Sequence, residues 1–257
     1  MGASGCGKTT LMSCIIGTNT LDRGKIEVFY NKVGTNKTKI GYMPQEMALM
    51  PEFTIRESIH FYGILYGMDK EKIDERIRFL CDLLDLQDQD KLVRKCSGGQ
   101  QRRISFAVAL VHEPDILILD EPTVGVDPLL RYRMWNFLVD LSRTKNTTIL
   151  ISTHYIEEAR KSSHVGLMRQ GILLIEDTPQ NLLQLCETDS LEDAFLQLSE
   201  QQEKRLRPPK IITTPEISEE KAKRLSKSKM EYFPPSFSTK LHALIMKSFI
   251  QTIRDPG

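Results

Sequence analysis

Residues near the start of the chain have the types and spacing of a phosphate-binding loop. Residues 2–9 read Gly-Ala-Ser-Gly-Cys-Gly-Lys-Thr, in which two glycines separated by four residues are followed by lysine and threonine. Glycines let backbone N–H groups converge on a phosphate, lysine offers a positive charge to its oxygens, and the threonine hydroxyl can ligate Mg²⁺. Lys8 and Thr9 therefore predict a site for a nucleotide and its metal ion.

Two carboxylates follow an apolar run that is short enough for a strand buried on both faces. Residues 116–121 read Ile-Leu-Ile-Leu-Asp-Glu, which places Asp120 and Glu121 at the carboxyl edge of a parallel sheet, where ligands bind. Adjacent strand residues point to opposite faces. We therefore expect Asp120 to hold the water shell of the metal ion and Glu121 to point elsewhere, toward an attacking water.

A second candidate anion site lies between these two motifs. Ser97-Gly98-Gly99-Gln100 precedes a helical stretch that stops before Glu113-Pro114, and Ser97 is placed to cap that helix. A serine and glycine amides at a helix N-terminus favour a bound anion.

In this order the motifs resemble the nucleotide-binding domain of ATP-binding cassette (ABC) transporters, over roughly residues 1–200. The resemblance identifies residues 97–100 as the signature, Gln45 as the Q-loop glutamine, Asp127 as the D-loop aspartate and His154 as the switch histidine. It implies ATP and Mg²⁺ as cofactors. The implied catalytic residues are Glu121, His154 and Gln45, and the implied metal-side residues are Thr9, Gln45 and Asp120. The implied nucleotide contacts are Gly2, Ser4, Gly5, Cys6, Gly7, Lys8, Thr9, Thr10, Ser97, Gly98, Gly99, Gln100 and Asp127.

The family also implies partners. ATP is expected between the phosphate-binding loop of one chain and the signature of a second nucleotide-binding domain, in a homo- or heterodimer, with hydrolysis coupled to a transmembrane domain. The protein is then a membrane-associated ABC half transporter that drives export, with this domain on the cytosolic face. The order of domains resembles subfamilies G and H, most closely arthropod subfamily H. The alternative is a soluble ABC-type ATPase that acts on ribosomes or DNA.

Two features depart from the family pattern. Cys96 stands where the family usually has leucine, which predicts a change in packing only. The strand that normally presents the phosphate-binding loop and the aromatic residue that stacks on adenine are absent before Gly2. We therefore expect a chain truncated at both ends, which binds ATP more weakly than a version extended upstream.

The composition gives no support for several other classes of protein and site. Basic residues number 35 and acidic residues 34, which gives no support for a nucleic-acid partner. The five cysteines contain no C-x-x-C pair, which favours reduced thiols over disulfides or a zinc site. No apolar run reaches the roughly 18 residues of a membrane span.

The sequence predicts an α/β fold, whose helices and strands must position these residues. We expect a P-loop NTPase core with a parallel sheet, incomplete N-terminal strands and a helical signature subdomain at about 52–112. Thr54 and Glu57 form a capping box, and apolar residues recur at helical spacing after them. A disordered linker is expected at 201–239 and an amphipathic helix that leads to a transmembrane domain at 240–257.

Overall fold

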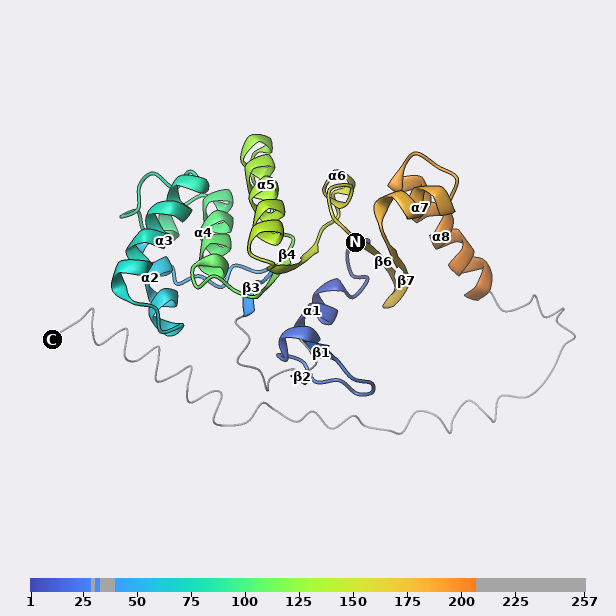
Figure 1. Ribbon diagram of the computed structural model, residues 1–257, viewed down its shortest axis with the longest axis horizontal. Helices are drawn as coiled ribbons and strands as arrows, with labels where there is room; N and C mark the ends of the chain where they lie inside the picture. The colour runs from blue at the N-terminus through green and yellow to red at the C-terminus, as the bar shows by residue number, and fades with distance from the viewer. Residues whose placement is uncertain (29–30, 33–39, 207–257) are drawn as a thin grey trace, which may run out of the picture. The chain divides into compact units, whose positions relative to one another are not determined.

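The computed structural model describes residues 1–28, 31–32 and 40–206, which lie in the compact unit Met1–Arg207 (Figure 1). The elements follow in the order α1 (Lys8–Ile16), β1 (Glu27–Val28), β2 (Asn31–Lys32), β3 (Ile40–Met43), α2 (Ile55–Leu65), α3 (Lys70–Leu83), the 3₁₀ turn η1 (Val93–Lys95), α4 (Gly98–Leu110), β4 (Ile116–Asp120), α5 (Pro128–Thr144), β5 (Thr148–Ser152), α6 (Ile156–Ala159), β6 (Val165–Arg169), β7 (Ile172–Asp177), α7 (Pro179–Leu185) and α8 (Leu191–Leu206).

A parallel sheet of order β3-β4-β5 carries the site. Every residue of β4 is buried, as its continuous apolar sequence predicts for a strand covered on both faces. The register pairs Met43 with Leu119 and Asp120 with Ser152. The carboxyl ends of the three strands therefore meet at one edge.

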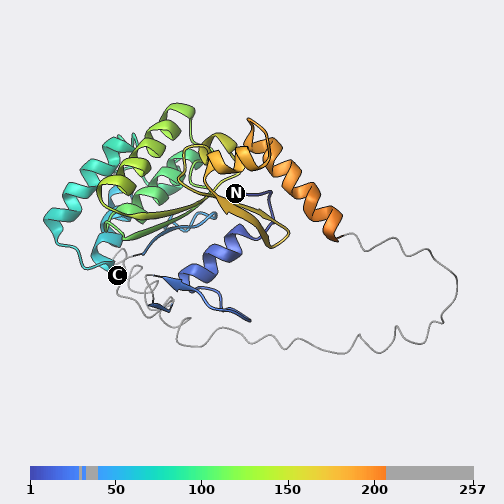
Figure 2. The ribbon, with the colours of Figure 1, turned by 45° about the vertical axis from the view of Figure 1, so that its right-hand side comes forward.

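Helices cover both faces of this sheet (Figure 2). Ile116 and Ile118 pack with Met12 of α1, whereas Leu117 and Leu119 belong to a larger core built from α2, α3, α4 and α5. The alternation along β4 separates the two layers, because successive side chains point to opposite faces. The phosphate-loop helix α1 and the signature helix α4 thus lie on opposite faces of the sheet.

The helical segment between β3 and β4 matches the sequence pattern. Thr54 and Glu57 form both bonds of a capping box at the start of α2. The apolar stripe of α3, which includes Ile73, Ile77 and Leu80, is buried against α2 and α4.

The β6–β7 hairpin anchors the beginning of the chain. The Met1 amino group donates to the Gly166 carbonyl at 2.6 Å, and the Met168 N–H donates to the Met1 carbonyl at 2.8 Å. The turn of the hairpin also contacts the phosphate-binding loop, because the Gly171 N–H donates to the Cys6 carbonyl at 3.0 Å. The loop is therefore held by backbone bonds from the hairpin.

Part of the predicted domain organisation lies outside the described residues. Helix α8 continues to Leu206, through residues that we expected to begin the linker. The rest of that linker and the helix expected at 240–257 are not among the described residues. Within residues 1–28, 31–32 and 40–206, no helix has the length and hydropathy needed to cross a bilayer.

Candidate functional site

The phosphate-binding loop has the backbone conformation that its glycines allow. Gly5 and Gly7 have φ values of 75° and 97°, in the left-handed region, and α1 begins directly afterwards at Lys8. The Lys8 ammonium is buried and donates to the carbonyls of Gly2 and Ala3 at 2.8 and 3.0 Å. This arrangement holds the cation at the N-terminus of a helix, where a phosphate is favoured.

Three oxygen-bearing side chains meet on the metal side of the predicted site. The Thr9 hydroxyl donates to Asp120 Oδ2 at 2.6 Å and lies 3.5 Å from Gln45 Oε1. Ser152 on β5 donates to the other oxygen of Asp120, which is buried. Neutral and anionic oxygens are the ligands that Mg²⁺ prefers, so Thr9, Gln45 and Asp120 fit this ion.

Glu121 leaves the extended backbone conformation of β4. Strand β4 ends at Asp120, and Glu121 has a φ of 51°, in the left-handed region. The Glu121 N–H donates to the carbonyl and hydroxyl oxygens of Ser152 at 3.1 and 3.0 Å. The predicted two directions are thus present, and the unusual backbone helps to produce them.

His154 lies beside the carboxylate of Glu121. Its Nδ1 is 3.4 Å from Glu121 Oε1, and its side chain is 46% exposed whereas that of Glu121 is 15% exposed. The two predicted catalytic residues therefore share one side of the site, and the histidine faces solvent, where it can approach a ligand or a partner.

The signature forms the predicted helix cap. Ser97 accepts from the Gln100 N–H at 3.2 Å, and the Gln100 side chain accepts from the Ser97 N–H at 3.0 Å. Both bonds of a capping box are present, so α4 begins at Gly98. Cys96 is buried and its thiol donates to the Leu92 carbonyl at 3.4 Å, in agreement with a packing role at this position.

The D-loop contacts the signature inside the same chain. A Cβ atom added to Gly99 would lie 2.6 Å from the Gly125 carbonyl oxygen, so only glycine fits at this position. Asp127 accepts from the Leu130 N–H at 3.0 Å and caps α5, with Pro128 as its first residue. The structure thus gives Asp127 a capping bond, while the nucleotide contact implied by the family remains a prediction.

Two buried charged residues lie near the site and were not predicted from the sequence. Arg102 on α4 is 3% exposed and donates to backbone carbonyls at the ends of β3 and β4. Glu158 on α6 accepts from the hydroxyls of Thr123 and Thr153, which follow Glu121 and precede His154. Arg102 is followed by Arg103, and Glu158 is preceded by Glu157. The sequence alone therefore does not show which member of each pair is buried.

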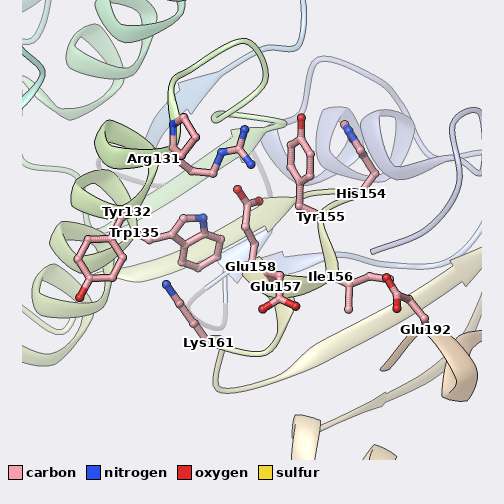
Figure 3. A pocket seen from close by; sticks show the side chains of 11 residues that line it. Arg131, Tyr132, Trp135, His154, Tyr155, Ile156, Glu157, Glu158, Lys161 and Glu192 are labelled. Atoms are coloured by element: carbon pink, nitrogen blue, oxygen red, sulfur yellow. The ribbon is translucent and has the colours of Figure 1, made fainter. Parts of the chain in front are cut away.

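An open cleft of about 460 Å³ lies beside His154, between α5 and α6 (Figure 3). Arg131 stacks over the ring of Tyr155 with its guanidinium carbon 4.3 Å from the ring centroid. The Lys161 ammonium nitrogen likewise lies over the ring of Tyr132, 4.8 Å from the ring centroid. These cation–π contacts brace the segment that carries His154 against α5.

The chain is similar in sequence to ABC transporter proteins. The family model described as ABC transporter matches residues 1–124. ABC transporter G family member 23 of Dictyostelium discoideum is 39% identical over 204 residues, which cover 77% of this chain and 29% of that protein. The Nod factor export ATP-binding protein I of Burkholderia lata is 35% identical over 190 residues, which cover 72% of this chain and 62% of that protein. The chain thus spans less than two thirds of either relative.

Solved structures agree with the fold. The ATP-binding subunit of an ABC transporter aligns with a TM-score of 0.71 at 22% identity, covering 77% of this chain and 86% of that one. The dimeric cassette MJ0796 in a post-hydrolysis state with ADP and Pi aligns with a TM-score of 0.64 at 25% identity, covering 69% of this chain and 83% of that one. The predicted α/β class is confirmed, as is the likeness to subfamily G, whereas the closer likeness to arthropod subfamily H stays a prediction.

Proposed function

We propose, from the premise that this chain belongs to the ABC transporter family as an ATP-binding domain, that its ATPase activity drives export by a half transporter. The observation that carries this proposal is the divergence of two consecutive carboxylates, Asp120 toward Thr9 and Glu121 toward His154. The relatives support export, since their names are those of an ABC transporter and of a Nod factor export protein.

The proposed chemistry is attack of water on the γ-phosphate of ATP, which forms a bond between the water oxygen and phosphorus, breaks the bond to the ADP oxygen, and releases ADP and phosphate. The amides of the phosphate-binding loop and Lys8 hold the phosphates, and Lys8 exchanges its bonds to loop carbonyls for bonds to phosphate oxygens. Mg²⁺ held by Thr9, Gln45 and Asp120 would neutralise charge on those oxygens. Glu121 orients the water and accepts its proton, and His154, 3.4 Å away, faces the same reacting group.

The Glu121→Gln and Lys8→Ala variants test this assignment. Glu121→Gln keeps the shape of the side chain and removes the base, so ATP affinity should stay within about twofold while hydrolysis falls by roughly 100-fold or more. Lys8→Ala should lose ATP binding itself, because it removes the cation from the loop. Calorimetric titration and phosphate release measure the two effects. Wild-type turnover in Glu121→Gln would overturn the role of Glu121.

We further propose that ATP is bound between two chains. Support comes from the dimeric structure of the cassette MJ0796 and from the opposite positions of α1 and α4 on the sheet, which favour a signature supplied by a neighbour. Symmetry then creates two identical composite sites, each with Lys8 from one chain and Ser97 from the other.

Mixing two inactive variants tests the composite site. Lys8→Ala damages the loop and Ser97→Arg damages the signature, so a mixed dimer retains one site with both halves intact. Activity should appear in the mixture and in neither variant alone, and it should rise with protein concentration. An inert mixture, combined with full activity of a monomeric wild-type preparation, would contradict the proposal.

Location and the membrane partner are proposed from the same relatives. We place the domain at the cytosolic face of a membrane, attached to or bound by a transmembrane domain. Fractionation of cells that express the protein at its natural length should recover it with membranes and release it only with detergent. Recovery with ribosomes or nucleic acid would favour the alternative of a soluble ABC-type ATPase.

A further inference from the structure

Arg102 carries a charge in the interior of the domain. It lies on α4, among side chains that pack against the sheet, and is 3% exposed. Burial lowers the pKa of its guanidinium below the ordinary value, with attraction to Glu121 and Asp120 acting in the opposite direction. Burying a cation has a large free-energy cost unless hydrogen bonds replace its hydration. The hydrogen bonds that replace the hydration of the Arg102 guanidinium therefore indicate the role of this residue.

The guanidinium donates to two separate segments of the site. Nη1 donates to the carbonyls of Gln45 at 2.5 Å and Pro44 at 3.4 Å, in the segment after β3. Nη2 donates to the carbonyls of Asp120 at 2.9 Å and Glu121 at 2.7 Å, and Nε donates to Glu121 at 3.2 Å, after β4. One side chain from the signature helix thus joins the backbones that present the metal-side and the water-side residues.

The geometry of this contact is difficult to reproduce with another side chain. A guanidinium is planar and has five N–H donors in a rigid fork, so it can bond two chain segments at once, whereas an ammonium is a compact charge with rotatable donors. The bond to the Glu121 carbonyl also supports a residue whose φ of 51° is sparsely populated.

We propose that Arg102 is a positioning residue that sets Glu121 and Gln45 from the signature helix, so that a displacement of α4 reaches both of them together. The proposal rests on the roles proposed above for these two residues. It assigns to a residue two positions after the signature a function in the phosphate loop's own half of the site. When a ligand or partner engages Ser97, Arg102 transmits the shift through three hydrogen bonds to the turn that holds the catalytic carboxylate and through two to the segment after β3.

The first test separates binding from turnover. Arg102→Met keeps the apolar stem and removes every donor, so we expect kcat to fall on the order of 10- to 100-fold, the usual result of a small misplacement, while ATP affinity changes by less than about twofold. Arg102→Lys keeps the charge and should recover part of the loss.

Arg76→Met is the matched control. The Arg76 guanidinium is also partly buried, its pKa is also lowered by burial, and it donates to the Leu110 carbonyl at 3.0 Å, at the far end of the same helix. It should lower the melting temperature and leave kcat within about twofold of wild type. Equal loss of kcat in both variants, or loss that follows the melting temperature, would overturn the proposal.

A second measurement does not depend on turnover. Hydrogen exchange in residues 44–50 and 121–126 should become faster in Arg102→Met and remain unchanged in Arg76→Met, because only the first variant frees the two turns. Unchanged exchange there would also overturn the proposal. If Glu121→Gln hydrolyses ATP normally while Arg102→Met shows the expected exchange, the failure lies in the role of Glu121 and the structural coupling stands.

Discussion

The hydroxyl of Thr9 and the carboxylate of Asp120 are joined by a hydrogen bond of 2.6 Å, although one lies in the first turn of α1 and the other ends β4. Ser152 holds the second oxygen of the same carboxylate from β5. The metal-side carboxylate is thus fixed from two elements, and its orientation is established by the protein itself. Preorganisation of this kind lowers the cost of binding an ion and its phosphate ligand.

Asp120→Asn should weaken ATP binding only when Mg²⁺ is present. The amide retains one oxygen and removes the negative charge that attracts the ion, so we expect a loss of about tenfold or more in affinity with Mg²⁺. In EDTA the variant and the wild type should bind ATP equally. Calorimetric titration under both conditions provides its own control, and a loss of equal size in EDTA would assign Asp120 a structural role.

Glu158→Ala should destabilise the protein and slow hydrolysis. The substitution leaves the hydroxyls of Thr123 and Thr153 buried without their acceptor, at a cost of roughly 1–3 kcal/mol for each group. It also cuts the connection between the segments that follow Glu121 and precede His154. Glu157→Ala, on the exposed neighbour, is the control and should change the free energy of unfolding by no more than about 0.5 kcal/mol. Urea denaturation and phosphate release distinguish the variants.

Gly99→Ala should destabilise the protein, whereas Gly98→Ala should not. The added methyl group at 99 would lie 2.6 Å from the Gly125 carbonyl oxygen, which forces the signature and the D-loop apart at a cost of roughly 1–3 kcal/mol. No atom lies within 4 Å of the methyl group at 98, so helix propensity makes that variant neutral or up to about 1 kcal/mol more stable. Thermal unfolding checks the pair, and equal melting temperatures would contradict the close contact.

Cys81 should resist alkylation while Cys14 reacts. Burial raises the pKa of the Cys81 thiol from 9.0 to about 11, so its reactive thiolate is scarce at pH 8. Because folding raises this pKa, the thiol contributes to stability below pH 9.0, and the contribution is lost as the pH rises through about 11. Mass spectrometry after a pulse of iodoacetamide should find Cys14 labelled first in the native protein and both residues labelled equally in urea.

The sequence was sufficient to predict the elements that local chemistry determines. The caps at Thr54 and Ser97 and the buried strand 116–120 are confirmed, since each depends on neighbouring residues. Helix α8 extends into the first residues of the predicted linker because residues 201–206 have good helix propensity despite their few apolar positions.

Long-range contacts account for what the sequence did not reveal. Arg102 and Glu158 are buried through bonds to segments far along the chain, and no local pattern distinguishes them from Arg103 and Glu157. The left-handed backbone of Glu121 is likewise imposed by its bonds to Ser152 on the adjacent strand. The roles of the individual site residues in binding and hydrolysis remain predictions.

The contact between the β6–β7 turn and the phosphate-binding loop limits how this domain can be engineered. Hairpin tips are ordinarily the first places to accept a peptide tag, a fluorophore or a circular permutation. Here the Gly171 N–H is bonded to the Cys6 carbonyl, and a Cβ atom at Gly7 would lie 3.6 Å from the Gly171 Cα atom. A reporter inserted at residues 169–172 would therefore perturb the nucleotide loop directly.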